Sequence, residues 1–219
     1  MKSNNGIFWE PLYNGLIQQD GNVMTVRSLA VENGTTTVYA GTYSGVYKTT
    51  DGGASWRASN AGISNVGVRS IAVDPLVKST VYAGGDDRLY KTTDGGQSWN
   101  RVRSLSATAV YDIVITTGLS DDLVGGRPLK TKTLPVITKT IYVATNDGVF
   151  MSTNDAASWS KMGSGWPSHP PYKGAYALAI QDRTVFAGTA RGVYRFDWQL
   201  IPRLLPEPSK VLPNPSERF

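Results

Sequence analysis

The acidic residues that could act as a catalytic pair stand next to each other in the sequence. Asp86 and Asp87 form one pair, and Asp121 and Asp122 form another. Glycoside hydrolysis needs two carboxyl groups at a defined separation across a cleft, where one acts as an acid and the other as a base or nucleophile. Neighbouring carboxylates in a loop point in different directions. We therefore interpret both pairs as solvated turns and expect no catalytic residue among them.

Other residues that could carry chemistry are few. The single histidine, His169, has no nearby Cys or His with which to share a metal ion, and the absence of cysteine excludes disulfides and thiolate ligands. Trp166 and Tyr172 could stack on a sugar or a peptide, but three prolines in the same loop favour simple packing. No phosphate-cradling P-loop motif occurs. We expect no metal, no cofactor and no nucleotide chemistry, which favours a binding module over an enzyme.

An internal repeat organises the rest of the chain. The period is about 43 residues, and it relates pairs of segments that are almost identical. β-branched and aromatic residues dominate these segments and turn-forming residues bound them, so we expect strands. The four copies comprise VRSLAV (26–31) with VYAGTYSGVYKT (38–49), VRSIAV (68–73) with VYAGGDDRLYKT (81–92), VYDIVI (110–115) with IYVATNDGVFMS (141–152), and YALAI (176–180) with VFAGTARGVYRF (185–196).

A turn signature follows three of the four copies. It reads TTDGGASW, then TTDGGQSW, and in the third copy STNDAASW, where Asn and Ala replace Asp and Gly. The acid can hold free N–H groups in an Asx-turn, the second glycine allows positive φ, and the tryptophan can clamp the turn onto the sheet. The expected turn-building residues are Thr49, Asp51, Gly53, Ser55 and Trp56, then Thr92, Asp94, Gly96, Ser98 and Trp99, then Ser152, Asn154 and Trp159.

This signature resembles the Asp-box, S/T-x-D-x-G-x-S/T-W, of sialidase-like β-propellers (BNR repeats). The resemblance implies an all-β propeller of about four four-stranded blades over residues 1–198, with a proline-rich tail or linker at 199–219. The family includes sialidases, xyloglucan-degrading hydrolases, sortilin-type receptors and a photosystem II assembly factor. It implies an extracytoplasmic location, although the N-terminus lacks the apolar core of a signal peptide. The RIP motif of sialidases is absent.

The fourth copy lacks its own turn signature. Residues 2–9, KSNNGIFW, place Asn4, Gly6 and Trp9 at the Asp, Gly and Trp positions. We predict that this N-terminal segment supplies the fourth strand of the last blade, with residues 7–13 beside the strand at 192–196, and so closes the ring. Two alternatives stay open: a homo-oligomer in which a second copy completes an eight-bladed ring, or a crop from a longer array.

The net charge of the chain and its insertion limit the kinds of partner that we expect. The formal net charge of +5 comes from scattered Lys and Arg, and no basic stripe is interleaved with aromatic residues, so we expect no nucleic acid. No apolar run is long enough to span a membrane. The third copy carries an insertion of about 17 residues within 118–139. It is either an elongated hairpin without a role or a contact arm for a partner.

Equivalent positions in the repeat point to a binding site. The second residue of each innermost strand is Arg27, Arg69, Tyr111 or Tyr176, and the loops that carry Ser44, Asp87, Asp147 and Arg191 should open on the same face. Arginine grips carboxylate oxygens in pairs and tyrosine donates a further bond. We predict a non-catalytic protein-binding site at the channel mouth for an acidic or carboxylate-bearing segment. Alternatives are structural ion pairs of the arginines, for instance with Asp112, and a divergent or truncated glycoside hydrolase or glycan-binding propeller.

Overall fold

The computed structural model describes residues 9–63, 67–119, 123–124, 127–128, 137–163, 173–181 and 184–197. All regular elements in these ranges are β-strands. Within the same ranges, no helix has the length and apolar character needed to cross a membrane.

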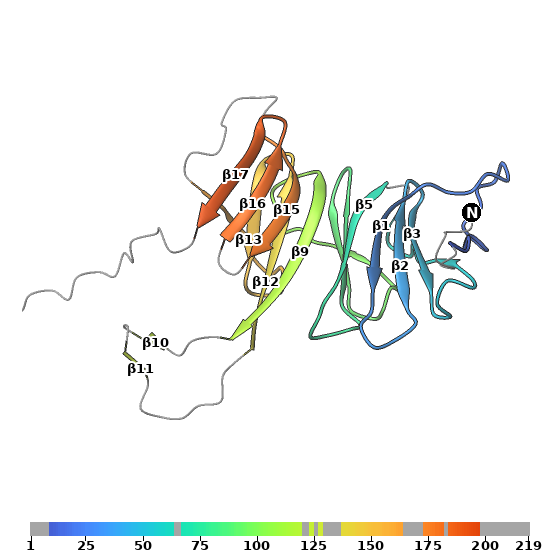
Figure 1. Ribbon diagram of the computed structural model, residues 1–219, viewed down its shortest axis with the longest axis horizontal. Coiled ribbons are helices and arrows are strands. Elements are labelled where there is room, and N and C mark those ends of the chain that lie inside the picture. Colours follow the sequence, from blue (N-terminus) through green and yellow to red (C-terminus); the bar gives the residue numbers. More distant parts are fainter. Residues whose placement is uncertain are drawn as a thin grey trace, which may run out of the picture.

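Four antiparallel sheets follow one another along the chain (Figure 1). Three have four strands, and the fourth has three described strands, each sheet pairing its strands in sequence order. The first sheet comprises β1 (Val26–Val31), β2 (Val38–Thr42), β3 (Gly45–Thr49) and β4 (Arg57–Ala58). The second comprises β5 (Val68–Val73), β6 (Val81–Gly85), β7 (Leu89–Thr92) and β8 (Asn100–Arg101). The third comprises β9 (Val110–Leu119), β12 (Ile137–Thr145), β13 (Gly148–Ser152) and β14 (Ser160–Lys161). The fourth comprises β15 (Ala175–Gln181), β16 (Thr184–Thr189) and β17 (Gly192–Asp197), and β10 (Leu123–Val124) pairs separately with β11 (Arg127–Pro128).

The core lies between successive sheets. Tyr39 and Val46 of the first sheet pack with Ile71 and Val81 of the second. Two further clusters join the second sheet to the third and the third to the fourth. A sheet with a neighbour on each side buries both of its faces, which explains why all five residues of β6 are buried. The repeat therefore supplies one hydrophobic interface for each pair of adjacent sheets.

Two equivalent glycines set the spacing of the first three sheets. A Cβ atom at Gly41 would lie 2.8 Å from Val68 Cγ1, and one at Gly84 would lie 2.7 Å from Val110 Cγ1. Both separations are shorter than carbon atoms tolerate. Glycine in β2 and β6 thus allows the innermost strand of the next sheet to approach closely.

The innermost strands β1, β5, β9 and β15 lie in sequence against one another. Each has a break in its pairing near its start, with a register shift that leaves one residue outside the regular ladder. A β-bulge of this kind redirects the side chain of the extra residue. The bulged residues are Arg27, Arg69, Tyr111 and Tyr176.

The predicted closure by the N-terminal segment is wrong for residues 9–13. The indole N–H of Trp56 donates to Leu12 O (3.1 Å), and the backbone N–H of Trp56 donates to Asn14 O (2.8 Å). These bonds hold the segment on the first sheet, whereas β17 lies at the opposite end of the row of sheets (Figure 1). In the described part of the chain the sheets thus form an open row. Asn4 and Gly6 lie outside the described residues.

The insertion in the third copy lengthens one hairpin. β9 and β12 pair from Val110 and Thr145 out to Leu119 and Ile137, well beyond the ends of the equivalent strands. The elongated hairpin expected from the sequence is therefore present at its root. Most of residues 120–136, and the whole of 199–219, lie outside the described residues.

Candidate functional site

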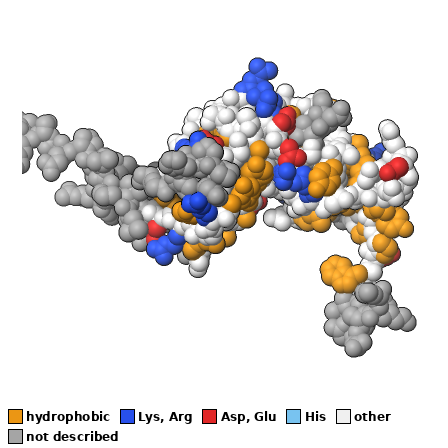
Figure 2. Space-filling model, turned by 90° about the horizontal axis from the view of Figure 1, so that it is seen from above, with side chains coloured by type: hydrophobic (Ala, Val, Ile, Leu, Met, Phe, Trp, Pro, Cys, Tyr) orange, Lys and Arg blue, Asp and Glu red, His pale blue; other side chains and the backbone are white. Residues whose placement is uncertain are grey.

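Four equivalent bulge residues and two loop residues form a row across the innermost strands. The guanidinium of Arg27 lies 4.6 Å from the ring centroid of Tyr43, and that of Arg69 lies 5.2 Å from the ring of Tyr111. The rings of Tyr111 and Tyr176 are 5.1 Å apart and tilted by 37°. Figure 2 shows basic, acidic and hydrophobic side chains side by side near the middle of this face. We call this set the bulge row; its members are Tyr43, Arg27, Asp86, Arg69, Tyr111 and Tyr176.

Asp86 lies between the two arginines. Its Oδ2 atom is 3.6 Å from Arg27 Nη1, and its Oδ1 atom accepts a hydrogen bond from Arg69 Nε. The side chain of Asp86 is 45% exposed. Asp86 thus lies in an exposed turn, as the sequence predicts, and two cations from neighbouring sheets hold its carboxylate in addition.

The structural ion pairs of Arg27 and Arg69, left open as an alternative by the sequence, are present, but their partner is Asp86 and not Asp112. The carboxylate of Asp112 accepts hydrogen bonds from Leu178 N (2.8 Å), Ile113 N (2.9 Å) and Ser70 Oγ (3.3 Å). These donors come from the innermost strands of the second, third and fourth sheets. Asp112 thus links three sheets, and the ion-pairing role belongs to Asp86.

The bulge row keeps an unused cationic donor. Arg27 Nη1 is buried, and among the described residues it has no hydrogen-bond acceptor. Its 3.6 Å separation from Asp86 is longer than a hydrogen bond. Two guanidinium groups share one carboxylate, so the row retains a positive charge beside three phenol rings. The more exposed guanidinium, that of Arg69, has the chemistry to contact a carboxylate oxygen, and the aromatic rings have the chemistry to pack against the attached chain.

The loops between second and third strands contribute unequally. The loop of the second sheet brings Asp86 into the row, and the neighbouring Asp87 has a buried Oδ1 without a hydrogen-bond partner among the described residues. Asp147 forms an ion pair with Lys161 (2.9 Å) on its own sheet. Arg191 is exposed in the turn between β16 and β17, where its N–H donates to Thr189 Oγ1 (3.1 Å). Arg191, the fifth predicted binding residue, is not among the six residues that define the bulge row.

The turn signatures lie at the other end of the strands. Asp51 accepts hydrogen bonds from Thr49 Oγ1 (2.6 Å), Ser55 N (2.9 Å) and Ser55 Oγ (2.6 Å). Asp94 receives the same three bonds from Thr92 and Ser98. The serine and threonine hydroxyls hold the pKa of both carboxyl groups far below the usual range. These acids therefore stay ionised and organise turns, with the buried Trp56 and Trp99 beneath them.

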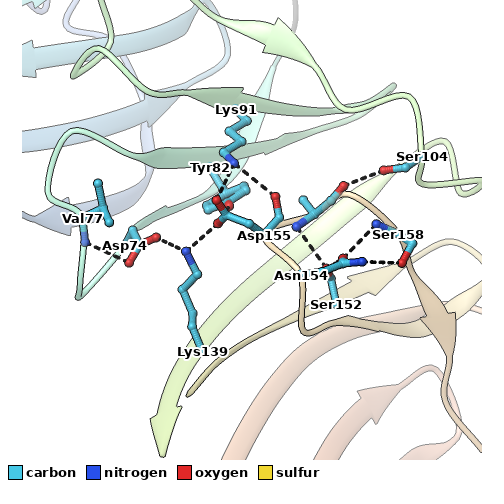
Figure 3. Close-up of polar contacts among 11 residues, drawn as sticks. Asp74, Val77, Tyr82, Lys91, Ser104, Lys139, Ser152, Asn154, Asp155 and Ser158 are labelled. Atoms are coloured by element: carbon cyan, nitrogen blue, oxygen red, sulfur yellow. Dashed lines mark hydrogen bonds and ion pairs between the residues drawn. The ribbon is translucent and has the colours of Figure 1, made fainter. Parts of the chain in front are cut away.

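The third turn keeps this pattern with different residues (Figure 3). Asn154 Oδ1 accepts from Ser158 N (2.9 Å), and its amide donates to Ser158 Oγ (2.8 Å). Ala156 N donates to Ser152 Oγ (3.0 Å), as Gly53 N does to Thr49 Oγ1. Trp159 is partly buried at the expected position, whereas Trp9, the fourth predicted tryptophan, is exposed.

Asp155, which stands where the other turns have glycine, joins an ion network (Figure 3). Lys139 Nζ lies between Asp74 and Asp155, 2.5 Å from the latter. Lys91 Nζ is 3.1 Å from Asp155, and the Tyr82 hydroxyl donates to it (2.9 Å). Burial raises the pKa of Asp155, but the hydrogen bonds from these three residues outweigh it and lower that pKa to about 2. The network fixes the root of the elongated hairpin to the second sheet.

Tyr43, Asp86 and Asp155 were not predicted as site residues from the sequence. A usable signal was present, because GDDR in the second copy replaces TYSG in the first and so puts Asp86 at the position of Tyr43. Asp121, Asp122, Trp166, His169 and Tyr172 lie outside the described residues. Among the residues that the structure does describe, no group of three or more His, Cys, Asp or Glu side chains could hold a metal ion.

Solved β-propeller structures resemble this fold. The GH74 xyloglucanase of Xanthomonas campestris matches with a TM-score of 0.54 at 18% identity, over 84% of this chain and 31% of the xyloglucanase. The extracellular domain of a one-component system of B. thetaiotaomicron matches with 0.56 at 16%, over 82% and 21%. YCF48 bound to D1 peptide matches with 0.50 at 15%, over 80% and 52%.

This chain therefore spans about a fifth to a half of the propellers that it resembles. No protein-family model matches the sequence, and no curated protein does. The likeness shows the fold: the four sheets are arranged as consecutive blades of a β-propeller.

Proposed function

We propose that this protein is a non-catalytic binding or scaffold propeller that holds an acidic or carboxylate-bearing protein segment on the bulge row. The observation that carries the proposal is that two guanidinium groups, those of Arg27 and Arg69, share the single carboxylate of Asp86, and that the Arg69 side chain is 38% exposed. A partly exposed guanidinium such as that of Arg69 gains a charge-assisted hydrogen bond when a carboxylate arrives. Tyr111 and Tyr176 extend the row as an aromatic surface for the rest of the segment.

The structural likenesses support this reading without deciding it. YCF48, a propeller of similar fold, binds a D1 peptide, which makes peptide capture a natural use of such a scaffold. The extracellular domain of a one-component system among the similar structures favours an extracytoplasmic location for this chain as well. Residues 1–198 form the propeller in this proposal, and 199–219 form its tail or linker.

The direct test is the binding of a labelled peptide that ends in several glutamates and a free carboxylate. We expect fluorescence anisotropy to show saturable binding, and we expect Arg27→Glu/Arg69→Glu to abolish it. A matched control is Arg57→Glu/Arg101→Glu, because these exposed arginines on β4 and β8 carry the same charge change away from the row. If the row variant binds as the native chain does, or if both double variants lose binding equally, the site is wrong.

The second candidate function is a divergent or truncated glycoside hydrolase or a glycan-binding propeller. The observation that favours it is the fold shared with a GH74 xyloglucanase, together with tyrosine rings in the bulge row on which a sugar could stack. A glycan array and a hydrolase screen that includes xyloglucan oligosaccharides separate the two functions. Turnover of any glycoside would overturn the non-catalytic proposal, whereas glycan binding without turnover would indicate a lectin-like role.

A further inference from the structure

The N-terminal segment follows the path of a fourth strand that leads into the next sheet. Asn14 O accepts from Trp56 N (2.8 Å), as Ala61 O accepts from Trp99 N (2.8 Å). The indole N–H of each tryptophan donates to the carbonyl two residues before that acceptor. Residues 12–16 thus contact the first sheet as residues 59–63 contact the second.

The residues before this path have no sheet to join. Trp9, Glu10 and Pro11 align with Trp56, Arg57 and Ala58, the last two of which form β4. No strand is assigned to residues 9–13 in the described chain, and Trp9 is 89% exposed. The segment therefore has the sequence context of a fourth strand and lacks a third strand beside it.

The fourth sheet has a third strand but, among the described residues, no fourth strand beside it. Among the described residues its strand order ends at β17, and Val193 of that strand is 72% exposed. The equivalent residues of the other three sheets, Val46, Leu89 and Val149, are buried. In those sheets the equivalent backbone carbonyl accepts an N–H from the residue after the fourth strand. The edge of β17 is thus suited to receive a further strand.

The sheet faces at the two ends are complementary in the same way. Leu29 of the first sheet is 62% exposed, whereas its equivalents Ile71 and Ile113 are buried against the preceding sheet. In the described chain Leu29 has no preceding sheet to pack against, and the face of the fourth sheet around Val193 is equivalent to the face that covers Ile71. The two ends of the row therefore expose faces equivalent to the two that pack together between the first and second sheets: the face around Val193 corresponds to that of Val46, and Leu29 corresponds to Ile71.

We infer that a second copy of this chain completes both ends. The N-terminal segment of the second copy pairs with β17 of the first copy, and the first sheet of the second copy packs on the fourth sheet of the first. A two-fold axis repeats both contacts. The chain's own segment does not fill its own edge, because the two ends lie at opposite sides of the row (Figure 1). A head-to-tail contact that closes after two chains gives a ring of eight sheets without open ends. This inference does not depend on the ligand of the bulge row.

Register and charge agree with this pairing. Lys48 of β3 lies opposite Arg57 of β4, so the equivalent pair places Arg195 of one copy opposite Glu10 of the other. Opposite charges at directly facing positions, such as Arg195 and Glu10, stabilise an antiparallel pair, whereas the like charges of Lys48 and Arg57 in the first sheet destabilise theirs. Pro11 falls at the position of Ala58, whose N–H points away from β3 because Ser59 N donates to Val46 O. A proline is tolerated there.

The mass of the 219-residue chain in solution is the first test. We expect light scattering to give about twice 23.7 kDa, and we expect Val193→Asp to raise the dissociation constant by more than about a hundredfold, since each of two junctions would bury an unpaired carboxylate. Leu76→Asp is the matched control, because Leu76 is also exposed but lies in a loop far from both ends. A monomeric native chain, or equal effects of the two substitutions, would overturn the inference.

Cysteine cross-linking then identifies the contact, and the chain offers a cysteine-free background. We expect co-expressed Glu10→Cys and Arg195→Cys chains to form a disulfide-linked pair, which neither chain forms alone. A disulfide within single chains of the Glu10→Cys/Arg195→Cys variant, at monomer mass, would show that the chain closes on itself. Absence of both products would show that something else covers β17. Either of these two results refutes the second copy as occupant.

Discussion

Lys139→Met should destabilise the protein more than any other substitution of a lysine on the described strands. Lys139 Nζ lies between the carboxylates of Asp74 and Asp155, and the Asp74 side chain has no solvent-exposed surface. Methionine keeps the apolar stem and removes the charge. Asp74 would then be a buried carboxylate held by the N–H groups of Leu76 and Val77 alone.

The expected loss is about 3 kcal/mol, the lower end of the range for breaking a buried ion pair by removing one partner. The lower end applies because Asp74 keeps two backbone hydrogen bonds and Asp155 is half exposed. This loss changes the unfolding equilibrium constant by about a hundredfold. Urea unfolding at pH 7, with the m-value compared between variants, measures it.

Two further variants decide whether the reasoning is right. Lys139→Met/Asp74→Asn removes both charges while an amide oxygen still accepts the two N–H groups, so we expect it to recover most of the loss. Lys78→Met changes an exposed lysine in the loop after Asp74 and should alter the free energy of unfolding by less than about 0.5 kcal/mol. A loss below about 1 kcal/mol for Lys139→Met would mean that the network behaves as a surface ion pair, which contradicts the argument.

Two other predictions concern pH and packing. The pKa of Asp155 is lowered to about 2, and the pKa values of Asp51 and Asp94 are lowered further, so their contributions to stability are complete above the unfolded pKa near 4 and are lost as pH falls through the folded values. Thermal unfolding from pH 7 to pH 2 should therefore show a falling Tm, and Asp51→Asn/Asp94→Asn should flatten that fall; an unchanged slope would contradict the turn-capping role. Gly84→Ala should cost about 2 kcal/mol, because its methyl group would clash with Val110 and push two sheets apart. Gly118→Ala, where the nearest atom is 3.7 Å away, is the control, and equal urea midpoints for the two variants would show that the sheets are not closely packed at Gly84.

Much of the fold could be predicted from the sequence because the repeat is local. Segments such as 26–31 and 68–73 are predicted as strands with the observed bounds, since each combines β-branched residues with adjacent turn formers. The same alignment predicts that Arg27, Arg69, Tyr111 and Tyr176 occupy equivalent places. The alignment can predict this because successive sheets stack on one another, which places equivalent residues side by side.

What the alignment could not predict depends on pairing between distant parts of the chain. The bulges are invisible in one strand, because a register shift exists only relative to its partner. Asp86 forms ion pairs although it is partly exposed, because the loop of the second sheet lies beside Arg69 of its own sheet and Arg27 of the first sheet. The N-terminal segment aligns with a fourth strand, yet residues 9–13 form no strand in the described chain, and sequence similarity does not say which sheet would receive it.

The bulges make the side chains of the bulge row independent of the strand pairing around them. A residue in a regular ladder is constrained by its cross-strand neighbour, whereas Arg27 and its three equivalents stand outside the ladder. The residue before each of them is Val or Ala in all four copies, whereas they themselves change from arginine to tyrosine. Substitutions at these four positions could therefore change what the bulge row recognises, one position at a time, without repacking any of the sheets.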